Sequence, residues 1–158
     1  PFVEDVPVTS AQELFEAVDA RFAATDILIM AAAVADYRPA QAADHKIKKG
    51  DGELSLPLAR TTDILGTLGP KKREGQFLCG FAMETENLLE NAAAKLKKKN
   101  LDMICANSLR TEGAGFGVDT NVLTLLTADS RTALPLQSKA DAADAILDAI
   151  AARRAQKQ

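Results

Sequence analysis

The chain contains no tryptophan, one tyrosine, one histidine and two cysteines among its 158 residues. Aromatic residues make up only 4%, which argues against a stacking platform for single-stranded nucleic acid. The formal net charge of −3 also argues against nucleic acid as a partner. Because His45 is the only histidine, a metal site built from several histidines is excluded.

The sequence also lacks an apolar run of about 18 residues, the length that a membrane-spanning helix requires. Residues 1–5 are acidic and do not resemble the basic start of a signal peptide. Cys79 and Cys105 lie in apolar runs without C-x-x-C spacing, which favours reduced core thiols over a disulfide or metal pair. These features predict a cytoplasmic protein without a membrane partner.

Apolar segments and helix signals alternate along the chain. The runs expected to be buried strands are residues 26–33, 77–82 and 102–106. The helices expected between and around them are a segment to about Ala24 behind the capping box at Ser10, residues 63–68 behind Thr62, and residues 86–99. Such strand–helix alternation predicts a parallel sheet with right-handed crossovers.

The remaining elements complete a prediction of a single domain over residues 1–158. Residues 54–58 alternate like an edge strand, and residues 122–127 and 134–136 predict a terminal hairpin. Ser138 is expected to cap a last helix whose inner face carries Ala143, Ile146, Leu147 and Ile150. The predicted fold class is α/β, with a Rossmann-like, mostly parallel sheet, flanking helices and a C-terminal β-hairpin.

Very small side chains occupy the end of the first predicted strand and the positions after it, over residues 31–35, and Asp36, Tyr37 and Arg38 come next. Ligands of open α/β sheets bind at the carboxyl ends of the strands, where alanines let a ligand approach the backbone. Lys46, Lys48 and Lys49 follow in a polar segment. The combination suggests a phosphate-bearing substrate, although a lysine cluster alone is more often a solvated loop.

Further polar residues fall where the other predicted strands end. These residues are Glu84 and Thr85 after the second strand and Asn107 after the third. Taken singly, Asn107 and Asn121 are expected to serve turns, and His45 to be a solvated loop residue. No G-x-G-x-x-G or Walker motif is present, which argues against a nicotinamide dehydrogenase.

Lys95 and Lys99 are four residues apart and share one face of the predicted helix over residues 86–99. Two ammonium groups on one face can bind an anion together. They also complement the negative end of the helix dipole, which alone explains their position. The sequence is consistent both with anion binding by the two lysines and with a role in the helix dipole alone.

Several strings, in this order, resemble bacterial phosphopantothenoylcysteine synthetases. They are Ala32-Ala33-Val34-Ala35-Asp36-Tyr37-Arg38, Lys46-Ile47-Lys48-Lys49, Thr62-Asp63-Ile64-Leu65, Gly80-Phe81-Ala82 with Glu84-Thr85, Lys95 and Lys99 before Asn100-Leu101-Asp102, and Ala106-Asn107. The resemblance covers nearly the whole chain. It implies a homodimeric, Rossmann-like ligase that uses CTP and Mg²⁺, usually fused to a flavin-dependent decarboxylase domain.

The resemblance implies a two-step reaction of coenzyme A biosynthesis. The carboxylate of 4′-phosphopantothenate attacks the α-phosphate of CTP, giving an acyl-cytidylate and pyrophosphate. The amine of cysteine then displaces CMP and forms 4′-phosphopantothenoylcysteine. Charge neutralisation by lysines and Mg²⁺ suits the attack of an anion on a triphosphate.

The resemblance also implies roles for individual residues. Lys46 matches the catalytic lysine of the family, and Ala32, Ala33 and Asp36 match the substrate site. The matched nucleotide contacts are Met30, Ala31, Ala32, Asp36, Lys46, Thr62, Asp63, Ile64, Leu65, Phe81, Lys95 and Lys99. No metal ligand is implied among the side chains.

The sequence departs from the family in one respect. Members carry a further segment before the first helix, with a Gly-rich loop and an Asn-x-Ser-Ser-Gly stretch, and neither occurs here. We therefore expect the C-terminal portion of a synthetase, inactive alone. The alternatives are an ATP-dependent synthetase of the same family and a catalytically dead nucleotide-binding or dimerisation module.

Overall fold

The structure is a computed structural model that describes residues 2–41, 43, 45–48, 52–84, 87–108 and 117–156. A five-stranded sheet forms its centre, in the order β1-β4-β5-β7-β8. Its strands are β1 (Ile27–Met30), β4 (Phe77–Glu84), β5 (Met103–Ser108), β7 (Thr124–Leu126) and β8 (Arg131–Ala133). The first three strands are parallel and the last two antiparallel, so the predicted α/β class with a mostly parallel sheet and a terminal hairpin is confirmed.

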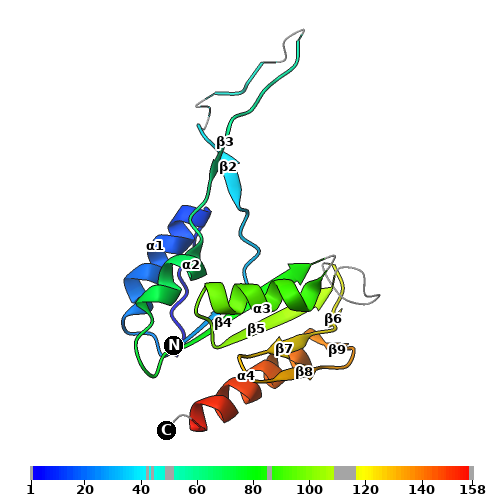
Figure 1. The fold of residues 1–158 in the computed structure, drawn as a ribbon. Coiled ribbons are helices and arrows are strands. Elements are labelled where there is room, and N and C mark those ends of the chain that lie inside the picture. The colour runs from blue at the N-terminus through cyan, green and yellow to red at the C-terminus, as the bar shows by residue number, and fades with distance from the viewer. Residues whose placement is uncertain are drawn as a thin grey trace.

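Helices cover both faces of this sheet (Figure 1). They are α1 (Ala11–Phe22), α2 (Ile64–Leu68) with a following 3₁₀ turn (Gly69–Lys71), α3 (Leu88–Lys98) and α4 (Lys139–Ala155). Alternate strand residues face opposite sides. Leu78 and Ile104 therefore pack in the core under α1, α2 and α3, while Cys79 and Cys105 pack in the core under α4.

The two cysteines are free and fully buried, with their sulfur atoms 3.7 Å apart. The hydrogen bond to Cys79, followed by burial, raises the pKa of the Cys105 thiol well above its usual range. The Cys105 thiol therefore remains protonated at neutral pH. Both cysteines are free, and the prediction of reduced core thiols is confirmed.

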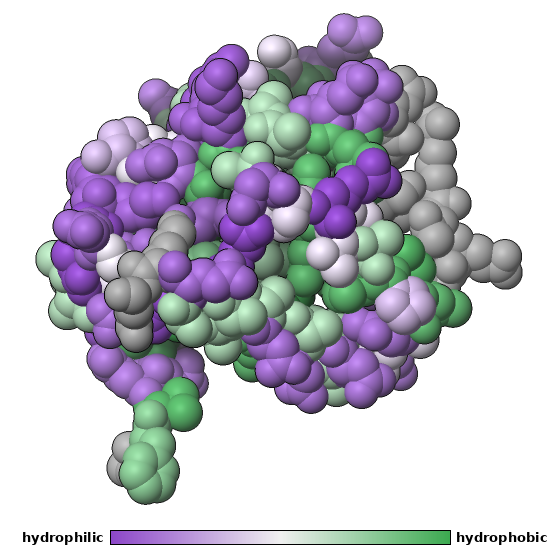
Figure 2. Space-filling view, turned by 60° about the horizontal axis from the view of Figure 1, so that its bottom comes forward, coloured by the Kyte–Doolittle hydropathy of each residue, from purple (hydrophilic) through white to green (hydrophobic). Residues whose placement is uncertain are grey.

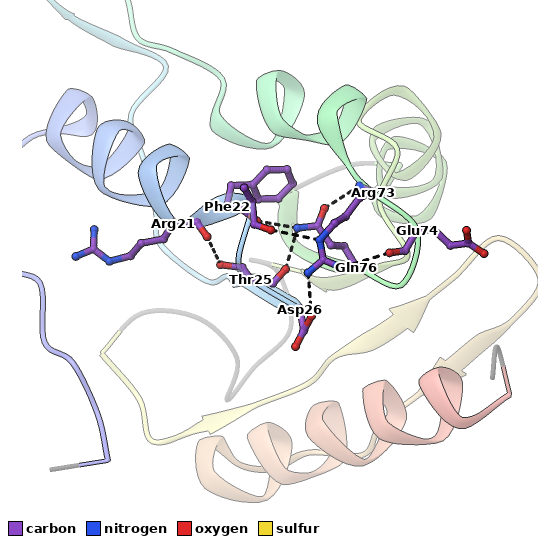
Figure 3. Close-up of polar contacts among 8 residues, drawn as sticks. Arg21, Phe22, Thr25, Asp26, Arg73, Glu74 and Gln76 are labelled. Carbon is purple, nitrogen blue, oxygen red and sulfur yellow. Dashed lines mark hydrogen bonds and ion pairs between the residues drawn. The ribbon is translucent and has the colours of Figure 1, made fainter.

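Polar contacts tie the end of α1 to the turn before β4 (Figure 3). The buried Gln76 donates from Nε2 to the carbonyl oxygens of Phe22 at 2.7 Å and Thr25 at 2.8 Å. The guanidinium group of Arg73 contacts Asp26 at 3.0 Å, and the Arg73 N–H donates to Gln76. These bonds fix the amino ends of β1 and β4, the parallel pair whose opposite ends carry the candidate site.

Several predicted boundaries were wrong by a few residues. The first strand ends at Met30 instead of residue 33, α1 ends at Phe22 instead of Ala24, and α3 begins at Leu88. The short helix α2 is capped by Asp63, whose side chain accepts the Gly66 N–H, and not by Thr62. The second strand of the hairpin is residues 131–133 instead of 134–136.

The inner face of α4 also differs from the prediction. Ser138 caps the helix as expected, and Ile146 and Ile150 are buried. Ala142 takes the place predicted for Ala143, while Ala143 and Leu147 are exposed. The helix is rich in alanine throughout, so its apolar pattern does not define one face.

A long arm projects away from the body between residues 37 and 60 (Figure 1). At its base, β2 (Tyr37–Pro39) pairs antiparallel with β3 (Leu58–Arg60). The edge strand predicted over residues 54–58 is wrong, because only Leu58 of this segment belongs to a strand. A second small sheet joins β6 (Thr120–Asn121) to β9 (Gln137–Ser138).

Hydrophobic side chains along the arm are more than half exposed. They are Ile47, Leu54, Leu56 and Leu58. The body is also not closed everywhere: Figure 2 shows hydrophobic surface in hollows between polar side chains on the face that lies at the bottom of Figure 1. No helix in the described ranges is long and apolar enough to cross a membrane.

Candidate functional site

A cleft of about 130 Å³ lies at the carboxyl end of β1, on the side of the sheet covered by α2. We call it the α2 cleft. It is lined by Met30, Ala32, Val34, Ala35, Asp36, Thr61, Thr62, Asp63, Ile64, Leu65 and Phe81. Eight of these residues belong to the predicted nucleotide contacts, so segments far apart in the sequence meet here.

Two loops that line the α2 cleft are hydrogen-bonded to each other. The Thr61 N–H donates to the carbonyl oxygen of Asp36 at 2.9 Å, and the Thr61 hydroxyl contacts the carbonyl oxygen of Ala35. These bonds hold the small-residue loop after β1 against the segment that leads into α2. Sequence reasoning missed Thr61, although it directly precedes the motif at Thr62.

Asp63 is the best-defined polar group of the cleft. Its Oδ1 accepts the Gly66 N–H at 3.0 Å, as the cap of α2, and also accepts from Lys99 Nζ at 2.8 Å. The side chain is still 53% exposed, so a ligand can reach it. An ionised carboxylate in this position is a suitable acceptor for hydroxyl groups.

Opposing effects set the ionisation of Asp63. Burial works to raise its pKa, but the hydrogen bonds from Lys99 and Gly66 outweigh that effect. The positive charges of Lys99 and Lys98 act in the same direction. Together they hold the pKa of the Asp63 carboxyl below its usual value, so the carboxylate stays charged at neutral pH.

The two predicted lysines of α3 differ in position. Lys99, the residue that ends the helix, crosses to α2 through its ion pair with Asp63 and so lies beside the α2 cleft. Lys95 is half-buried on the same helix but does not line the cleft. The structure therefore brings one of the two ammonium groups to the predicted site.

Lys46 lies on the arm and is exposed. It does not line the α2 cleft. Lys48 is exposed on the same segment, and Lys49 lies outside the described residues. The arm points away from the body in Figure 1, so the structure does not join Lys46 to the cleft of its own chain.

A second pocket of about 410 Å³ lies on the other side of the sheet, against α4. We call it the α4 pocket. It is lined by Ala31, Ala32, Ala33, Phe81, Met83, Asn107, Asn121, Leu123, Lys139, Ala142, Ala143 and Ile146. The predicted Ala31 and Ala33 open into this pocket, while Ala32 and Phe81 line both spaces.

The candidates at the other strand ends have different outcomes. Asn107 lies within β5 at 4% exposure, so the turn role expected for it is wrong. Asn121 lies in β6, so the turn role expected for it is wrong as well; its Oδ1 accepts the Val122 N–H at 2.9 Å. Glu84 ends β4, but its side chain and all of Thr85 lie outside the described part of the chain.

In the part of the chain that the structure describes, no three histidine, cysteine, aspartate or glutamate side chains gather into a metal site. Asp36 and Asp63 are the only carboxylates that line the α2 cleft among the described residues. Magnesium commonly binds through one or two carboxylates together with substrate phosphates and waters. These two carboxylates fit a Mg²⁺ ion whose other ligands are mainly phosphate oxygens and waters.

The sequence matches the family described as the DNA/pantothenate metabolism flavoprotein C-terminal domain over residues 1–153. The coenzyme A biosynthesis bifunctional protein CoaBC of Bacillus subtilis (strain 168) is 49% identical over 150 residues, which cover 94% of this chain and 37% of that protein. A protein of an unknown prokaryotic organism, named cysteine/cysteine sulfinic acid decarboxylase, is 50% identical over 121 residues, 77% of this chain and 34% of that protein. The chain thus spans little more than a third of the relatives' length.

Solved structures show the same fold. The crystal structure of the C-terminal domain of coenzyme A biosynthesis bifunctional protein CoaBC superposes with a TM-score of 0.74 at 41% identity, over 94% of this chain and 66% of that one. A Cab2 mutant in complex with phosphopantothenate-cysteine has the same TM-score at 19% identity, which supports the fold alone. By sequence and by fold, the chain belongs to the DNA/pantothenate metabolism flavoprotein C-terminal domain family.

Proposed function

We propose that the chain forms the nucleotide-binding part of a CTP-dependent ligase that joins 4′-phosphopantothenate and cysteine. The observation that carries the proposal is the α2 cleft, where residues from three separate segments converge in a chain of this family. The relatives named CoaBC support coenzyme A biosynthesis as the setting. A flavin-dependent decarboxylase domain in the full-length protein accords with the same relatives.

The chemistry of the α2 cleft suits a nucleotide. The ionised Asp63 accepts the hydroxyl groups of a ribose, while Lys99 holds it in place. The alanine-rich loop after Met30 lets phosphate groups approach the backbone. Asp36 stands on the same loop and would hold a Mg²⁺ ion that arrives with the triphosphate.

The reaction proceeds in two steps. A carboxylate oxygen of 4′-phosphopantothenate attacks the α-phosphorus of CTP, and pyrophosphate leaves with the electron pair of the broken P–O bond. The resulting acyl-cytidylate is a mixed anhydride, which the amine of cysteine opens with release of CMP. Negative charge develops on the phosphate in both steps, and ammonium groups and Mg²⁺ stabilise it.

Lys46 acts from a second copy of the chain in this proposal. It is exposed on an arm that leaves the body, and the arm carries apolar side chains such as Leu54 and Leu56 with no core of their own. A homodimer covers this surface and places each arm against the partner's cleft. Each active site is then built from both copies.

The experiment that tests the function is a comparison of nucleotides with the full-length protein that carries this chain. Calorimetric titration with Mg²⁺ present should show tighter binding of CTP than of ATP or NADH. Pyrophosphate should be released only when phosphopantothenate is added. Equal or tighter ATP binding would favour the ATP-dependent alternative, whereas nucleotide binding without pyrophosphate release would favour an inactive binding module.

A further inference from the structure

The α4 pocket contains a buried amide that the rest of the described structure does not use. Asn107 follows Met103 and Cys105 on the same face of β5, and both of those residues are fully buried. Asn107 is 4% exposed and lines the pocket. Its side chain forms no hydrogen bond with another described residue, and it is not among the fully enclosed polar atoms of the described residues, so it opens into the pocket. A polar side chain at the end of a buried apolar row calls for a partner.

A cation stands at the rim of the same pocket. Lys139 is the first residue of α4, and its N–H donates to the carbonyl oxygen of Asp119 at 2.9 Å, which fixes the backbone there. Its side chain is exposed. The adjacent cap is already satisfied, because Ser138 Oγ accepts the Asp141 N–H at 3.0 Å. Lys139 is therefore the group at this helix end that remains to bind an anion.

The rest of the described pocket wall is uncharged and mostly apolar. It includes Met83, Leu123, Ala142 and Ile146 but no carboxylate. A ligand that fits carries an anionic group for Lys139, a hydrogen-bond donor for Asn107 and a small apolar or sulfur-containing part. These are the groups of a small amino acid.

The α4 pocket and the α2 cleft are neighbours at the sheet edge. Ala32 and Phe81 line both of them. Because the two spaces share wall residues, a molecule in the pocket lies close to a nucleotide-activated group in the cleft. The volume of about 410 Å³ leaves room for an amino acid together with the end of an acyl chain.

We infer that the α4 pocket binds cysteine, the amine co-substrate, an assignment that rests on the ligase function proposed above. Lys139 binds the cysteine carboxylate, and the carboxamide oxygen of Asn107 accepts a hydrogen bond from the neutral amine. The amine nitrogen forms a bond to the acyl carbon, and the bond from that carbon to the phosphate oxygen breaks. CMP leaves with the electron pair, and the amine proton passes to water. Asn107 is a positioning residue that directs the nitrogen lone pair.

The test separates the two half-reactions in the full-length protein. Exchange of labelled pyrophosphate into CTP needs phosphopantothenate but no cysteine, whereas CMP release needs cysteine. In Asn107→Leu, the KM for cysteine should rise at least tenfold while pyrophosphate exchange is unchanged. The fold should tolerate this change, since the amide has no hydrogen-bond partner within the described part of the chain and is replaced by an apolar side chain of similar size.

A second variant tests the carboxylate contact. The wild-type protein should prefer cysteine over cysteamine, which lacks the carboxylate, and Lys139→Met should reduce this preference at least fivefold. Lys97→Met, an exposed lysine of α3 without an assigned role, is the matched control and should keep the preference. If Asn107→Leu does not fold, the Lys139 comparison decides the assignment.

The other outcomes are distinct. Wild-type protein without pyrophosphate exchange would overturn the ligase function and this inference with it. Normal exchange with an unchanged KM for cysteine in Asn107→Leu, or an unchanged preference in Lys139→Met, would overturn the pocket assignment alone. A loss of exchange with a raised KM for phosphopantothenate would instead assign the pocket to the acyl substrate.

Discussion

The sheet body and the arm use hydrophobic residues in opposite ways. In the body, side chains such as Ile104 and Leu68 are almost completely buried between the sheet and its helices. In the arm, Leu54 and Leu56 are more than half exposed, and β2 and β3 pair only at its base. Burial stabilises the body within one chain, whereas the arm can gain the same free energy only from another surface.

This difference separates two roles. The body positions the α2 cleft, and its residues determine whether the chain folds. The arm contributes little to folding but carries Lys46, the residue to which the family resemblance gives a catalytic role. Substitutions should therefore affect stability in the body and function or association in the arm. The following predictions test that division, from the largest expected effect to the smallest.

Ile104→Ala should reduce the free energy of unfolding by about 3–4 kcal/mol, because it removes a fully buried side chain from β5. Urea unfolding of the 158-residue chain measures this loss. Leu147→Ala, at a 53% exposed position on α4, is the control and should change it by less than about 1 kcal/mol. Equal losses in the two variants would show that burial in the body is not what stabilises the chain.

Lys46→Gln in the full-length protein should lower amide formation on the order of 100-fold or more, since one cation that stabilises developing charge is lost. Stability should change by less than about 0.5 kcal/mol, because the side chain is exposed on the arm. Release of pyrophosphate and of CMP, followed separately, gives the rate of each step. The control is Lys48→Gln on the same segment, which should retain most of the activity. Normal turnover in both variants would show that this segment has no catalytic role and is only a solvated loop.

Asp63→Asn should weaken CTP binding about tenfold, because a charged acceptor for a hydroxyl group becomes neutral. Asparagine caps a helix as well as aspartate does, so α2 should persist and stability should fall by less than about 1 kcal/mol. Calorimetric titration measures the affinity. Unchanged affinity in the variant would remove Asp63 from the nucleotide site.

The same carboxylate gives a pH dependence with a defined sign. Its pKa is lowered in the folded chain, so its contribution to stability is present above the ordinary aspartate value of about 3.9 and is lost as the pH falls through the lower folded value. Unfolding of the wild type between pH 5 and 3 should therefore be steeper in pH than that of Asp63→Asn. Parallel curves would contradict the ion pair with Lys99.

The sequence predicted the body better than the arm for a physical reason. The parallel strands are buried on both faces, so β4 and β5 are continuous apolar runs, a pattern typical of buried parallel strands. The alternation over residues 54–58 resembles an edge strand, but no partner strand in the described chain pairs with most of it. The alternation of apolar and polar residues does not reveal whether a segment pairs with a neighbouring strand, and without that pairing it does not form a strand.

The sequence predicted the site residues that lie at strand ends or in family motifs, and missed one that only the folded structure brings to the site. The rule that ligands bind at strand ends, together with the family resemblance, identified Asp36 and Asp63, and the structure brings both into the α2 cleft. The cap at Asp63 was assigned to Thr62, because both residue types cap helices. Lys139 was missed because it lies far along the chain from the small-residue loop, and only the folded sheet edge brings them into one pocket.

The smallest expected effect concerns association through the arm. Leu56 is 51% exposed in the single chain, so complete burial in a dimer can yield only about half of the transfer free energy of a leucine, about 1 kcal/mol. Leu56→Ser should therefore weaken dimerisation about fivefold per arm. The unfolding of the monomeric chain should remain unchanged within about 0.5 kcal/mol, because the side chain is half exposed and belongs to neither hydrophobic core cluster. Sedimentation equilibrium at micromolar concentration measures the dissociation constant.

Leu147→Ser is the matched control, since Leu147 is equally exposed but lies on α4. It should leave the dimer intact if association occurs through the arm. A wild-type chain that sediments only as a 16.8 kDa species would contradict the homodimer for this chain. Equal weakening by both substitutions would instead place α4 in the interface. Either result would contradict the proposal that a second copy of the chain covers the exposed leucines of the arm. Lys46 would then have to reach the cleft of its own chain by a movement of the arm.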